Sequence, residues 1–446
     1  MKSIITMLAE VESRSKADYE KLKSGSYENY FGCGKSPESI FAWGDNLPFM
    51  KYLVDEKNMA GKIDMIYIDP PFFSKAAYSG TLTLEMPGQT AETGETAGSI
   101  ETAGSIETAG AEATKGKVLL RVAAYDDRNK NLKNYLLMLA VRLRMMKDLL
   151  KDTGTIWVHL DWHAVHYVKI LMDMIFGEKN FINEVVWSYK SGGSSRRTFA
   201  KKHDTLLFYS KTRKYNFHPL MEKSYNRGYK PYKFKGVREF EDELGWYTNV
   251  NMRDVWNIDM VGRTSGERNG YATQKPQELI RRIIESSTSE GDICADFFAG
   301  SGTLAATAQS MNRRFIACDA GGFSVSTSCR RLVESGAEFE LLIDTETQTN
   351  PGGAAFYFGS EPENTGTADA DKREDAAAHL KPKAEKYELA NPEIFLAPQD
   401  VQLLEEYLKT GDPARFLSIC GPACELTGKP EFVMDVFGNV AEIRQG

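Results

Sequence analysis

Apolar and polar positions alternate along this chain in a way that predicts strands and helices in turn. A β-rich run over 62–69 stops at two prolines, and apolar residues between 132 and 150 recur at helical spacing, with Gly154 as the predicted helix stop. A helix is expected near 163–176. Three more buried strands are predicted at 155–161, 184–189 and 205–211.

A second alternating unit follows. It comprises a predicted helix over 276–287, a strand over 292–298, a helix over 303–311 and a strand over 313–319. Strands that alternate with helices indicate an α/β fold with a doubly wound, mostly parallel sheet. Ligands bind such sheets beyond the carboxyl ends of their strands, so the candidate chemistry is sought there.

Two polar stretches interrupt this pattern. Residues 76–116 contain the hexapeptide ETAGSI in tandem from Glu95, which has too little apolar surface for a core and predicts a flexible surface insertion. The repeats are too few for a solenoid. The sequence around 351–386 reads as a linker, which leaves a large domain over 1–350 and a small C-terminal module over 387–446.

The 446 residues are 42% hydrophobic and 26% charged, as in ordinary soluble proteins with several domains. The net charge of −7, taken alone, argues against a nucleic-acid-binding protein. That average hides a strong segregation of charge. Residues 190–238 hold 14 Lys and Arg against two acids and include several tyrosines, whereas 76–116 and 333–446 are acidic. The basic stretch therefore predicts a DNA-binding segment.

Six cysteines without a C-x-x-C pair are typical of buried thiols in a reducing cytosol. Cys420 and Cys424 lack the further ligands of a zinc site, so no metal is expected. The N-terminus has no apolar signal region, and no stretch approaches 18 apolar residues. These features predict a cytoplasmic protein that does not span a membrane.

Residues 296–306, DFFAGSGTLAA, carry a glycine pattern between a predicted strand and a helix. Gly300, Gly302 and Ala305 fit the G-x-G-x-x-G/A fingerprint, and Asp319 ends the next strand, where it could bind a ribose hydroxyl. The pattern suits a nicotinamide nucleotide, a flavin or S-adenosylmethionine. Glycines needed only for helix–strand packing are the alternative.

The tetrapeptide Asp69-Pro70-Pro71-Phe72 also follows a predicted strand. The prolines fix the backbone and present carbonyl groups, while an ionised aspartate offers only hydrogen-bond acceptors. Acceptors beside an aromatic ring suit an exocyclic amino group on a base rotated out of a duplex. A rigid turn with a buried phenylalanine is the competing interpretation.

Histidines gather near a third strand end, at His159, His163 and His166, with Asp161 among them. A metal site is one interpretation; the favoured one is that Asp161 caps the helix that follows. His203 and Asp204 are predicted to lie in a loop before the strand over 205–211.

Seven segments in one order carry a resemblance to a known family. They are GDNLPF (44–49), IDMIYIDPPF (63–72), GTIWVHLD (154–161), FGEKNFINEVVW (176–187), KKHDTLLFYSK (201–211), YATQKPQELIRRII (271–284) and DFFAGSGT (296–303). Over residues 41–342 the chain resembles the β-group amino-methylating DNA methyltransferases of restriction–modification systems, and type III modification subunits are similar to it.

The resemblance implies a methyltransferase domain over 1–350 with a target-recognition region over 190–270. It implies that Asp69, Pro70, Pro71 and Phe72 are catalytic, although relatives usually have tyrosine in place of Phe72. It assigns cofactor binding to Asp45, Asn46, Thr273, Gln274, Lys275, Pro276, Asp296, Phe298, Gly300, Ser301, Gly302, Thr303 and Asp319. The basic residues predicted to bind DNA are Lys190, Arg196, Arg197, Lys201, Lys202, Arg213, Lys214, Arg227 and Lys230.

The expected activity is methyl transfer from S-adenosylmethionine to adenine N6 in double-stranded DNA, with base flipping. Aspartate at the first motif position favours adenine, since relatives that act on cytosine N4 mostly carry serine there. Cytosine-N4 methylation, a non-catalytic DNA-specificity subunit and a nicotinamide dehydrogenase are the alternatives. The resemblance also implies a homodimer and leaves open an accompanying restriction nuclease subunit.

Overall fold

The computed structural model of the chain describes residues 4–33, 38–73, 77–85, 117–126, 131–190, 196–262, 264–271, 273–345, 388–389, 430–434 and 440–445. The chain divides into two compact units. The first comprises Met1–Ala77 and Asp126–Ala354, and the second comprises Tyr78–Tyr125 and Ala355–Gly446.

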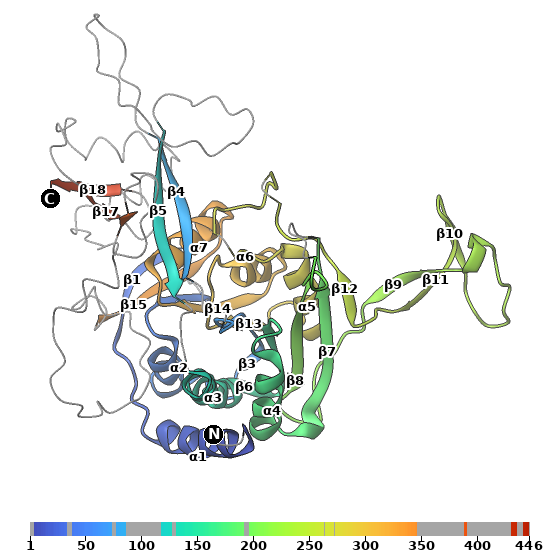
Figure 1. Ribbon diagram of the computed structural model, residues 1–446, viewed down its shortest axis with the longest axis horizontal. Coiled ribbons are helices and arrows are strands. Elements are labelled where there is room, and N and C mark those ends of the chain that lie inside the picture. The colour runs from blue at the N-terminus through green and yellow to red at the C-terminus, as the bar shows by residue number, and fades with distance from the viewer. Residues whose placement is uncertain are drawn as a thin grey trace, which may run out of the picture. The chain divides into compact units, whose positions relative to one another are not determined.

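A ten-stranded sheet forms the centre of the first unit (Figure 1). Its order is β1 (Tyr27–Cys33), β15 (Phe339–Asp344), β2 (Ile40–Trp43), β14 (Arg314–Asp319), β13 (Ile293–Asp296), β3 (Ile63–Ile68), β6 (Leu150–Leu160), β8 (His203–Ser210), β7 (Phe181–Ser188) and β12 (Val255–Asn257). The run from β15 to β6 is parallel, while β8 is antiparallel to both of its neighbours. The predicted mostly parallel sheet is confirmed.

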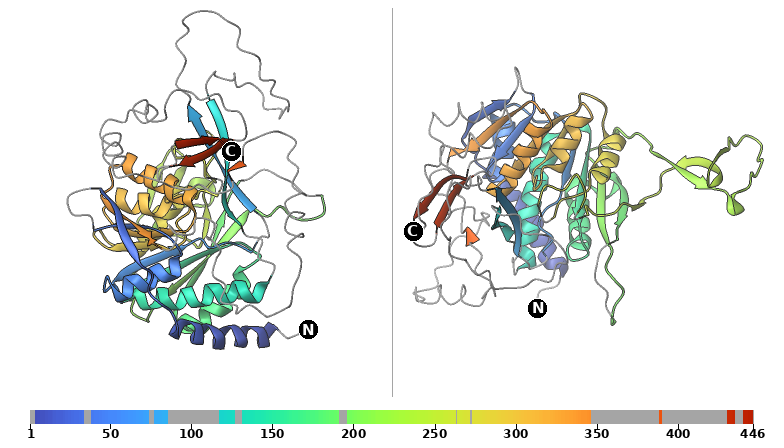
Figure 2. Two further views of the ribbon diagram at one scale, coloured as in Figure 1. Left: turned by 90° about the vertical axis from the view of Figure 1, so that its left-hand side faces the viewer. Right: turned by 90° about the horizontal axis from the view of Figure 1, so that it is seen from above.

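Helices pack on both faces of this sheet, as Figure 2 shows. One group comprises α1 (Ile4–Glu20), α2 (Asn46–Asp55), α3 (Leu132–Leu149) and α4 (Val165–Phe176), and the other comprises α5 (Gln277–Ser287), α6 (Thr303–Ser310) and α7 (Gly322–Glu334). Short 3₁₀ helices occur at Glu178–Asn180 (η1) and Arg227–Tyr229 (η2). Both groups bury apolar stripes against fully buried strands such as β3, so the fold is doubly wound, as predicted.

Gly154 does not stop the preceding helix. Helix α3 ends at Leu149, and strand β6 begins directly at Leu150 and includes Gly154. A Cβ at Gly154 would meet the carbonyl oxygens of Ile63 and Lys151 at 3.0 Å. Glycine therefore suits the place where β6 lies close to β3, near an irregularity in their pairing, and does not serve as a helix stop.

A small antiparallel sheet branches from the first unit beyond β12 (Figure 1). It contains β10 (Phe240–Asp242), β11 (Gly245–Asn251) and β9 (Met221–Tyr225), in that order. Residues 221–251 are called the arm below. The arm falls inside the predicted target-recognition region.

The second unit contains a three-stranded sheet of β16 (Glu388–Leu389), β5 (Lys117–Asp126) and β4 (Ala77–Glu85), and a hairpin of β17 (Pro430–Met434) and β18 (Val440–Gln445). The predicted insertion thus begins with a strand, because the alternating residues of 77–85 suit one better than a loop. Strand β16 of the predicted C-terminal module pairs with β5, so both segments contribute to one sheet. The tandem repeats and the predicted linker over 351–386 lie outside the described residues.

Candidate active site

Aspartates mark the carboxyl ends of five neighbouring parallel strands. Asp319 and Asp296 end β14 and β13, while Asp69 and Asp161 directly follow β3 and β6. Asp45 lies two residues beyond β2. Because carboxyl ends of parallel strands meet at one edge, residues far apart in sequence converge there, as predicted for a ligand site.

Asp69 is joined to Lys275, which lies immediately before the residue that caps α5. The Lys275 ammonium donates a hydrogen bond to Asp69 Oδ2 and lies 5.2 Å from the centre of the Phe72 ring. The other carboxylate oxygen, Oδ1, is buried and has no hydrogen-bond partner within the described part of the chain. A buried acceptor without a donor is costly, so Asp69 is suited to receive a donor from a ligand.

The glycine loop after β13 is held in place by the end of β14. Gly300 N donates to Asp319 Oδ2 at 2.8 Å, and Gly321 N donates to Asp319 Oδ1 at 2.8 Å. Gly300 and Gly302 both have left-handed φ values, 51° and 68°. A Cβ at Gly302 would lie 2.7 Å from Ser328 Oγ on α7, whereas one at Gly300 would only touch the Tyr271 ring at 3.5 Å. Gly302 is therefore needed so that the loop can pack against α7. A Cβ at Gly300 would make only an ordinary contact, so packing does not explain the glycine there.

Two carboxyl groups adjoin this loop; Asp296 is buried and Asp319 is half-buried. Burial raises the pKa of Asp296 well above its ordinary value, against the lowering effect of a hydrogen bond from Phe298 N at 3.0 Å. Burial also raises the pKa of Asp319, which its backbone donors partly oppose. Phe298 itself is only half-buried.

Asp45 and Asn46 are both held by a buried arginine of α3. Arg142 Nε donates to Asn46 Oδ1 at 2.6 Å, and Arg142 Nη2 donates to Asp45 Oδ1 at 2.8 Å. Asn46 also donates to Phe297 O, and Asp45 Oδ1 caps α2 by accepting from Leu47 N at 2.8 Å. The role of Arg142 could not be predicted from the sequence, because the apolar run of α3 holds a second arginine, Arg144, and only the fold shows which one is buried.

The segment before α5 lies beside the glycine loop. Thr303 Oγ1 donates to Lys275 O at 3.3 Å and contacts Ser301 Oγ at 3.0 Å. Gln274 is buried and accepts from Asn269 N at 2.9 Å. Thr273 is half-buried, and Pro276 is buried at the start of α5. The fold thus brings these predicted cofactor residues together from two segments of the chain.

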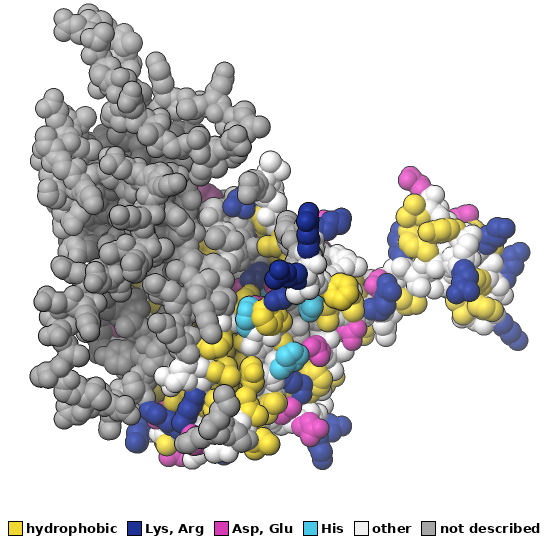
Figure 3. All heavy atoms as spheres, viewed as in Figure 1, with side chains coloured by type: hydrophobic (Ala, Val, Ile, Leu, Met, Phe, Trp, Pro, Cys, Tyr) yellow, Lys and Arg dark blue, Asp and Glu magenta, His cyan; other side chains and the backbone are white. Residues whose placement is uncertain are grey.

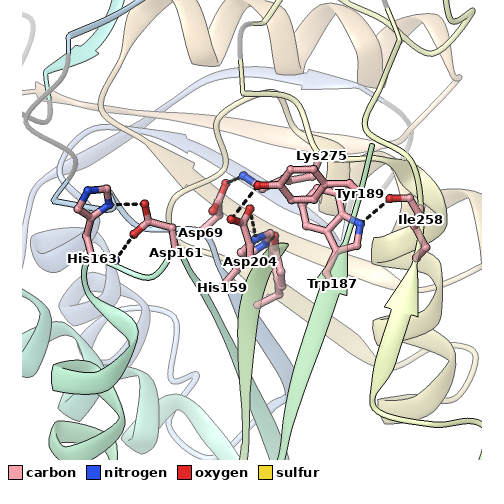
Figure 4. A network of polar contacts seen from close by, with 10 residues as sticks. Asp69, His159, Asp161, His163, Trp187, Tyr189, Asp204, Ile258 and Lys275 are labelled. Atoms are coloured by element: carbon pink, nitrogen blue, oxygen red, sulfur yellow. Dashed lines mark hydrogen bonds and ion pairs between the residues drawn. The ribbon is translucent and has the colours of Figure 1, made fainter. Parts of the chain in front are cut away.

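His159, near the carboxyl end of β6, is buried and belongs to a polar network (Figure 4). Its ring contacts that of Phe72. His159 Nε2 lies 3.2 Å from Asp204 Oδ2, and Asp204 Oδ1 accepts from the Tyr189 hydroxyl at 3.1 Å. The prediction that His203 and Asp204 form a loop is wrong. Both belong to β8, where pairing with β6 and β7 carries Asp204 inward.

The prediction that Asp161 caps the following helix is also wrong. Helix α4 begins at Val165, and its capping residue, Ala164, provides no side-chain hydrogen bond. The Asp161 carboxylate instead accepts from His163 N at 2.9 Å and from His163 Nδ1 at 2.6 Å, in the turn before the helix. Its backbone carbonyl accepts from Val165 N at 3.1 Å, so Asp161 holds the turn that precedes α4.

The predicted DNA-binding residues fall into three places. Lys190, Arg196, Arg197, Lys201 and Lys202 lie between β7 and β8 at the carboxyl edge that also carries Asp69. Arg227 and Lys230 are exposed on the arm, over which Figure 3 shows Lys and Arg side chains. Arg213 and Lys214 follow β8 at the opposite edge, where Lys211 N bonds Gly154 O at 3.0 Å. These last two residues are therefore separated from the candidate site.

The described residues contain no group of three or more His, Cys, Asp or Glu side chains placed to hold a metal ion. Within the same residues, no helix has the length and apolar character that a membrane crossing requires. Cys294, Cys318 and Cys329 are buried free thiols. Cys420 and Cys424 lie outside the described residues.

Comparison with known proteins identifies the family. A family model described as DNA methylase matches residues 63–327. The Type II methyltransferase M2.DpnII of Streptococcus pneumoniae is 29% identical over 182 residues, which are 40% of this chain and 60% of that protein. The Mod subunit of the Type III restriction-modification enzyme StyLTI of Salmonella typhimurium is 23% identical over 361 residues, which are 64% of this chain and 52% of that protein.

The structure of an M1.HpyAVI–SAM complex matches 66% of this chain and 98% of its own, at 16% identity and a TM-score of 0.38. The family model covers more than half of this chain, so the chain belongs to the DNA methylase family of N6 and N4 amino-methyltransferases. The resemblance inferred from the seven ordered segments is confirmed. S-adenosylmethionine is the cofactor of this family, as the resemblance implied.

Proposed function

We propose that the chain is a site-specific DNA methyltransferase that transfers the methyl group of S-adenosylmethionine to adenine N6 in duplex DNA. The observation that supports the proposal best is the hydrogen bonding of the Asp69 carboxylate. One of its oxygens is a buried acceptor without a donor, at the strand end beside the glycine loop and next to the Phe72 ring. An aromatic amino group would provide the missing donor.

The chemistry follows from the weak nucleophilicity of that amino group. Its lone pair is delocalised into the purine ring, so it attacks poorly until its hydrogens are drawn out of the ring plane. Asp69 Oδ1 and the carbonyl oxygen of Pro70 provide two acceptors, and Phe72 provides a face on which the base stacks. Stacking contributes about 1–3 kcal/mol, and orientation contributes the larger share, about 7–11 kcal/mol.

The glycine loop and its supports fit S-adenosylmethionine. Asp319 accepts hydrogen bonds from Gly300 N and Gly321 N, and hydrogen bonds from Ala320 N and the Ser324 side chain also act on its carboxylate. A ribose hydroxyl would join or replace one of these donors. The half-buried Phe298 ring offers a surface for the adenine, and Gly300 allows close approach to the loop. When bound, the sulfonium group supplies an activated methyl group, and no covalent nucleophile on the protein is needed.

The carboxyl edge between β7 and β8 suits a duplex that delivers its base to Asp69. Arg196, Arg197 and Lys201 are exposed there, and Phe199 is 99% exposed. Lys201 Nζ lies 3.4 Å from the centre of the half-exposed Trp162 ring. Lys and Arg side chains bind phosphate groups, and exposed aromatic rings stack with bases that have left the duplex. We assign target recognition to residues 190–270, including the arm.

The direct test is methyl transfer by the purified chain. Duplex DNA is incubated with isotope-labelled S-adenosylmethionine and digested to nucleosides, which are separated by mass spectrometry. The proposal expects the label in N6-methyladenine. Label in N4-methylcytosine would assign the alternative base, and absence of label with DNA binding retained would indicate a non-catalytic specificity subunit.

A further inference from the structure

Beneath the Phe72 ring lies a chain of four polar side chains from four segments of the sheet. Tyr67 of β3, His159 of β6 and Asp204 of β8 are each buried, and Tyr189 follows β7. Tyr67 OH lies 2.9 Å from His159 Nδ1, which continues the network of Figure 4 through His159 to Asp204 and Tyr189. Buried polar groups are normally hydrogen-bonded, and a connected network of four at the carboxyl edge of the sheet, beside the candidate site, calls for a functional explanation.

With a neutral His159, one assignment of donors and acceptors satisfies every hydrogen bond in this network. An ionised carboxylate only accepts, so Asp204 receives hydrogens from both the Tyr189 hydroxyl and His159 Nε2. With its hydrogen on Nε2, a neutral imidazole accepts at Nδ1, and Tyr67 is then the donor. Each side chain has its partner, which fixes the tautomer and the plane of the His159 ring.

The charge of Asp204 is maintained despite its position. Burial raises the pKa of Asp204, but the hydrogen bonds from His159 and Tyr189 and the positive charge of Lys275 outweigh burial and lower it. Burial, with the negative charges of Asp69 and Asp204, raises the pKa of Tyr67. Tyr67 therefore stays protonated and able to donate throughout the physiological range.

The fixed imidazole ring is in contact with the proposed base-stacking residue. The His159 ring lies 5.8 Å from the Phe72 ring centre to centre, inclined at 34°. On another side, Trp187 meets His159 edge-on at 5.4 Å and 85°. Trp187 is itself anchored by its indole N–H, which donates to Ile258 O at 2.8 Å. Rotation of the imidazole would thus remove the support beneath Phe72.

We propose that the Tyr67–His159–Asp204 chain is a positioning device that holds the Phe72 ring in the orientation on which the target base stacks. This inference rests on the proposed function, since it concerns the same site. It assigns a role to His159 and Asp204 that requires neither proton transfer nor contact with the substrate. The role predicts that the network affects the transfer step and not the capture of DNA.

Two variants test the network while preserving packing. Tyr67→Phe removes one hydroxyl, and Asp204→Asn keeps an acceptor but removes the charge that orients the imidazole. Each should lower the single-turnover rate of methyl transfer about 10- to 100-fold, as expected for misplacement of a reacting group. The KM for DNA and the affinity for S-adenosylmethionine should stay within about twofold of the wild-type values, since neither residue binds them.

A spectroscopic readout distinguishes positioning from general loss of structure. A 2-aminopurine at the target position, in the sequence found by methylation mapping, is quenched when it stacks on Phe72. Both variants should show brighter emission than wild type in the complex, because the flipped base is no longer held against the ring. Asp204→Leu, which removes the acceptor as well, should be brighter and slower than Asp204→Asn, so the conservative variant partly restores function.

Tyr209→Phe is the matched control. Tyr209 is equally buried in the same sheet, and its hydroxyl donates to Asp173 at 2.7 Å, a contact that does not reach Phe72. This variant should match Tyr67→Phe in thermal stability but keep the wild-type rate and emission. Wild-type rates and emission in both Tyr67→Phe and Asp204→Asn would overturn the inference. Failure of wild type to transfer methyl groups at all would overturn the proposed function instead.

Discussion

The Lys275 ammonium bonds one oxygen of Asp69 and lies over the Phe72 ring, so the two motifs recognised separately in the sequence meet at one ion pair. The positive charge compensates a carboxylate that is largely buried and keeps it available as an acceptor. It also lies where a ligand amino group would have to approach Asp69. The amino group of the target base must therefore bind Asp69 beside the Lys275 ammonium or displace it.

We therefore expect Lys275→Met to reduce the rate of methyl transfer about 100-fold or more, a typical cost of removing a positioned charge from a reacting site. Single-turnover rates of methyl transfer check this, with Lys275→Arg as the charge-retaining control that should keep more of the wild-type rate. A wild-type rate in Lys275→Met would exclude a role for this charge beside Asp69.

The two glycines of the loop should respond differently to alanine. Both have positive φ, but only a Cβ at Gly302 would collide with Ser328. Gly302→Ala should therefore lower the free energy of unfolding by about 1–3 kcal/mol more than Gly300→Ala, measured by urea titration. Gly300→Ala should instead weaken binding of S-adenosylmethionine in calorimetry. Equal destabilisation by the two variants would contradict this assignment.

Asp296→Asn should stabilise the protein in a pH-dependent way. The folded-state pKa of Asp296 is raised by burial, so its contribution to stability is present below the unfolded pKa of about 4 and is lost as pH rises toward the folded pKa. Within that window the free energy of unfolding of wild type falls by up to about 1.4 kcal/mol per pH unit relative to that of the variant. Unfolding free energies from pH 4 to 8 measure the difference. A constant difference across this range would show that Asp296 is not neutralised on folding.

The position of the basic residues predicts their effect on DNA affinity. Arg196 and Arg197 lie at the carboxyl edge near Asp69, whereas Arg213 and Lys214 lie at the opposite edge. Arg196→Ala with Arg197→Ala should reduce the slope of log affinity against log salt by about 1–2, since each phosphate contact contributes about 0.9. Arg213→Ala with Lys214→Ala removes the same charge and should leave the slope unchanged. Equal effects of the two pairs would refute the proposed DNA face.

Much of the fold and the candidate site could be predicted because the informative residues lie in local patterns. The run before Asp69 and the glycines at 300 and 302 each identify a strand end by themselves. Helical spacing likewise located α3, although Gly154 was taken for its end. Its real constraint is the close approach of β3, a contact between segments that no local pattern contains.

The features that were missed depend on pairing across the sheet. Asp204 is polar and follows a histidine, which is typical of a loop, yet register with β6 and β7 buries it beside His159. Arg142 is buried because Asp45 and Asn46, from a distant segment, supply its partners. Such compensation of a buried charge is visible only after the chain has folded.

The central claim is that Asp69 directs methyl transfer to adenine N6. Single-molecule sequencing of DNA from a host that expresses the chain, compared with a host that expresses Asp69→Ala, tests it most directly. The account predicts N6-methyladenine at one fixed sequence with wild type, and none with the variant, while the purified variant still binds DNA and S-adenosylmethionine. N4-methylcytosine in the wild-type sample, or adenine methylation that persists with Asp69→Ala, would contradict it.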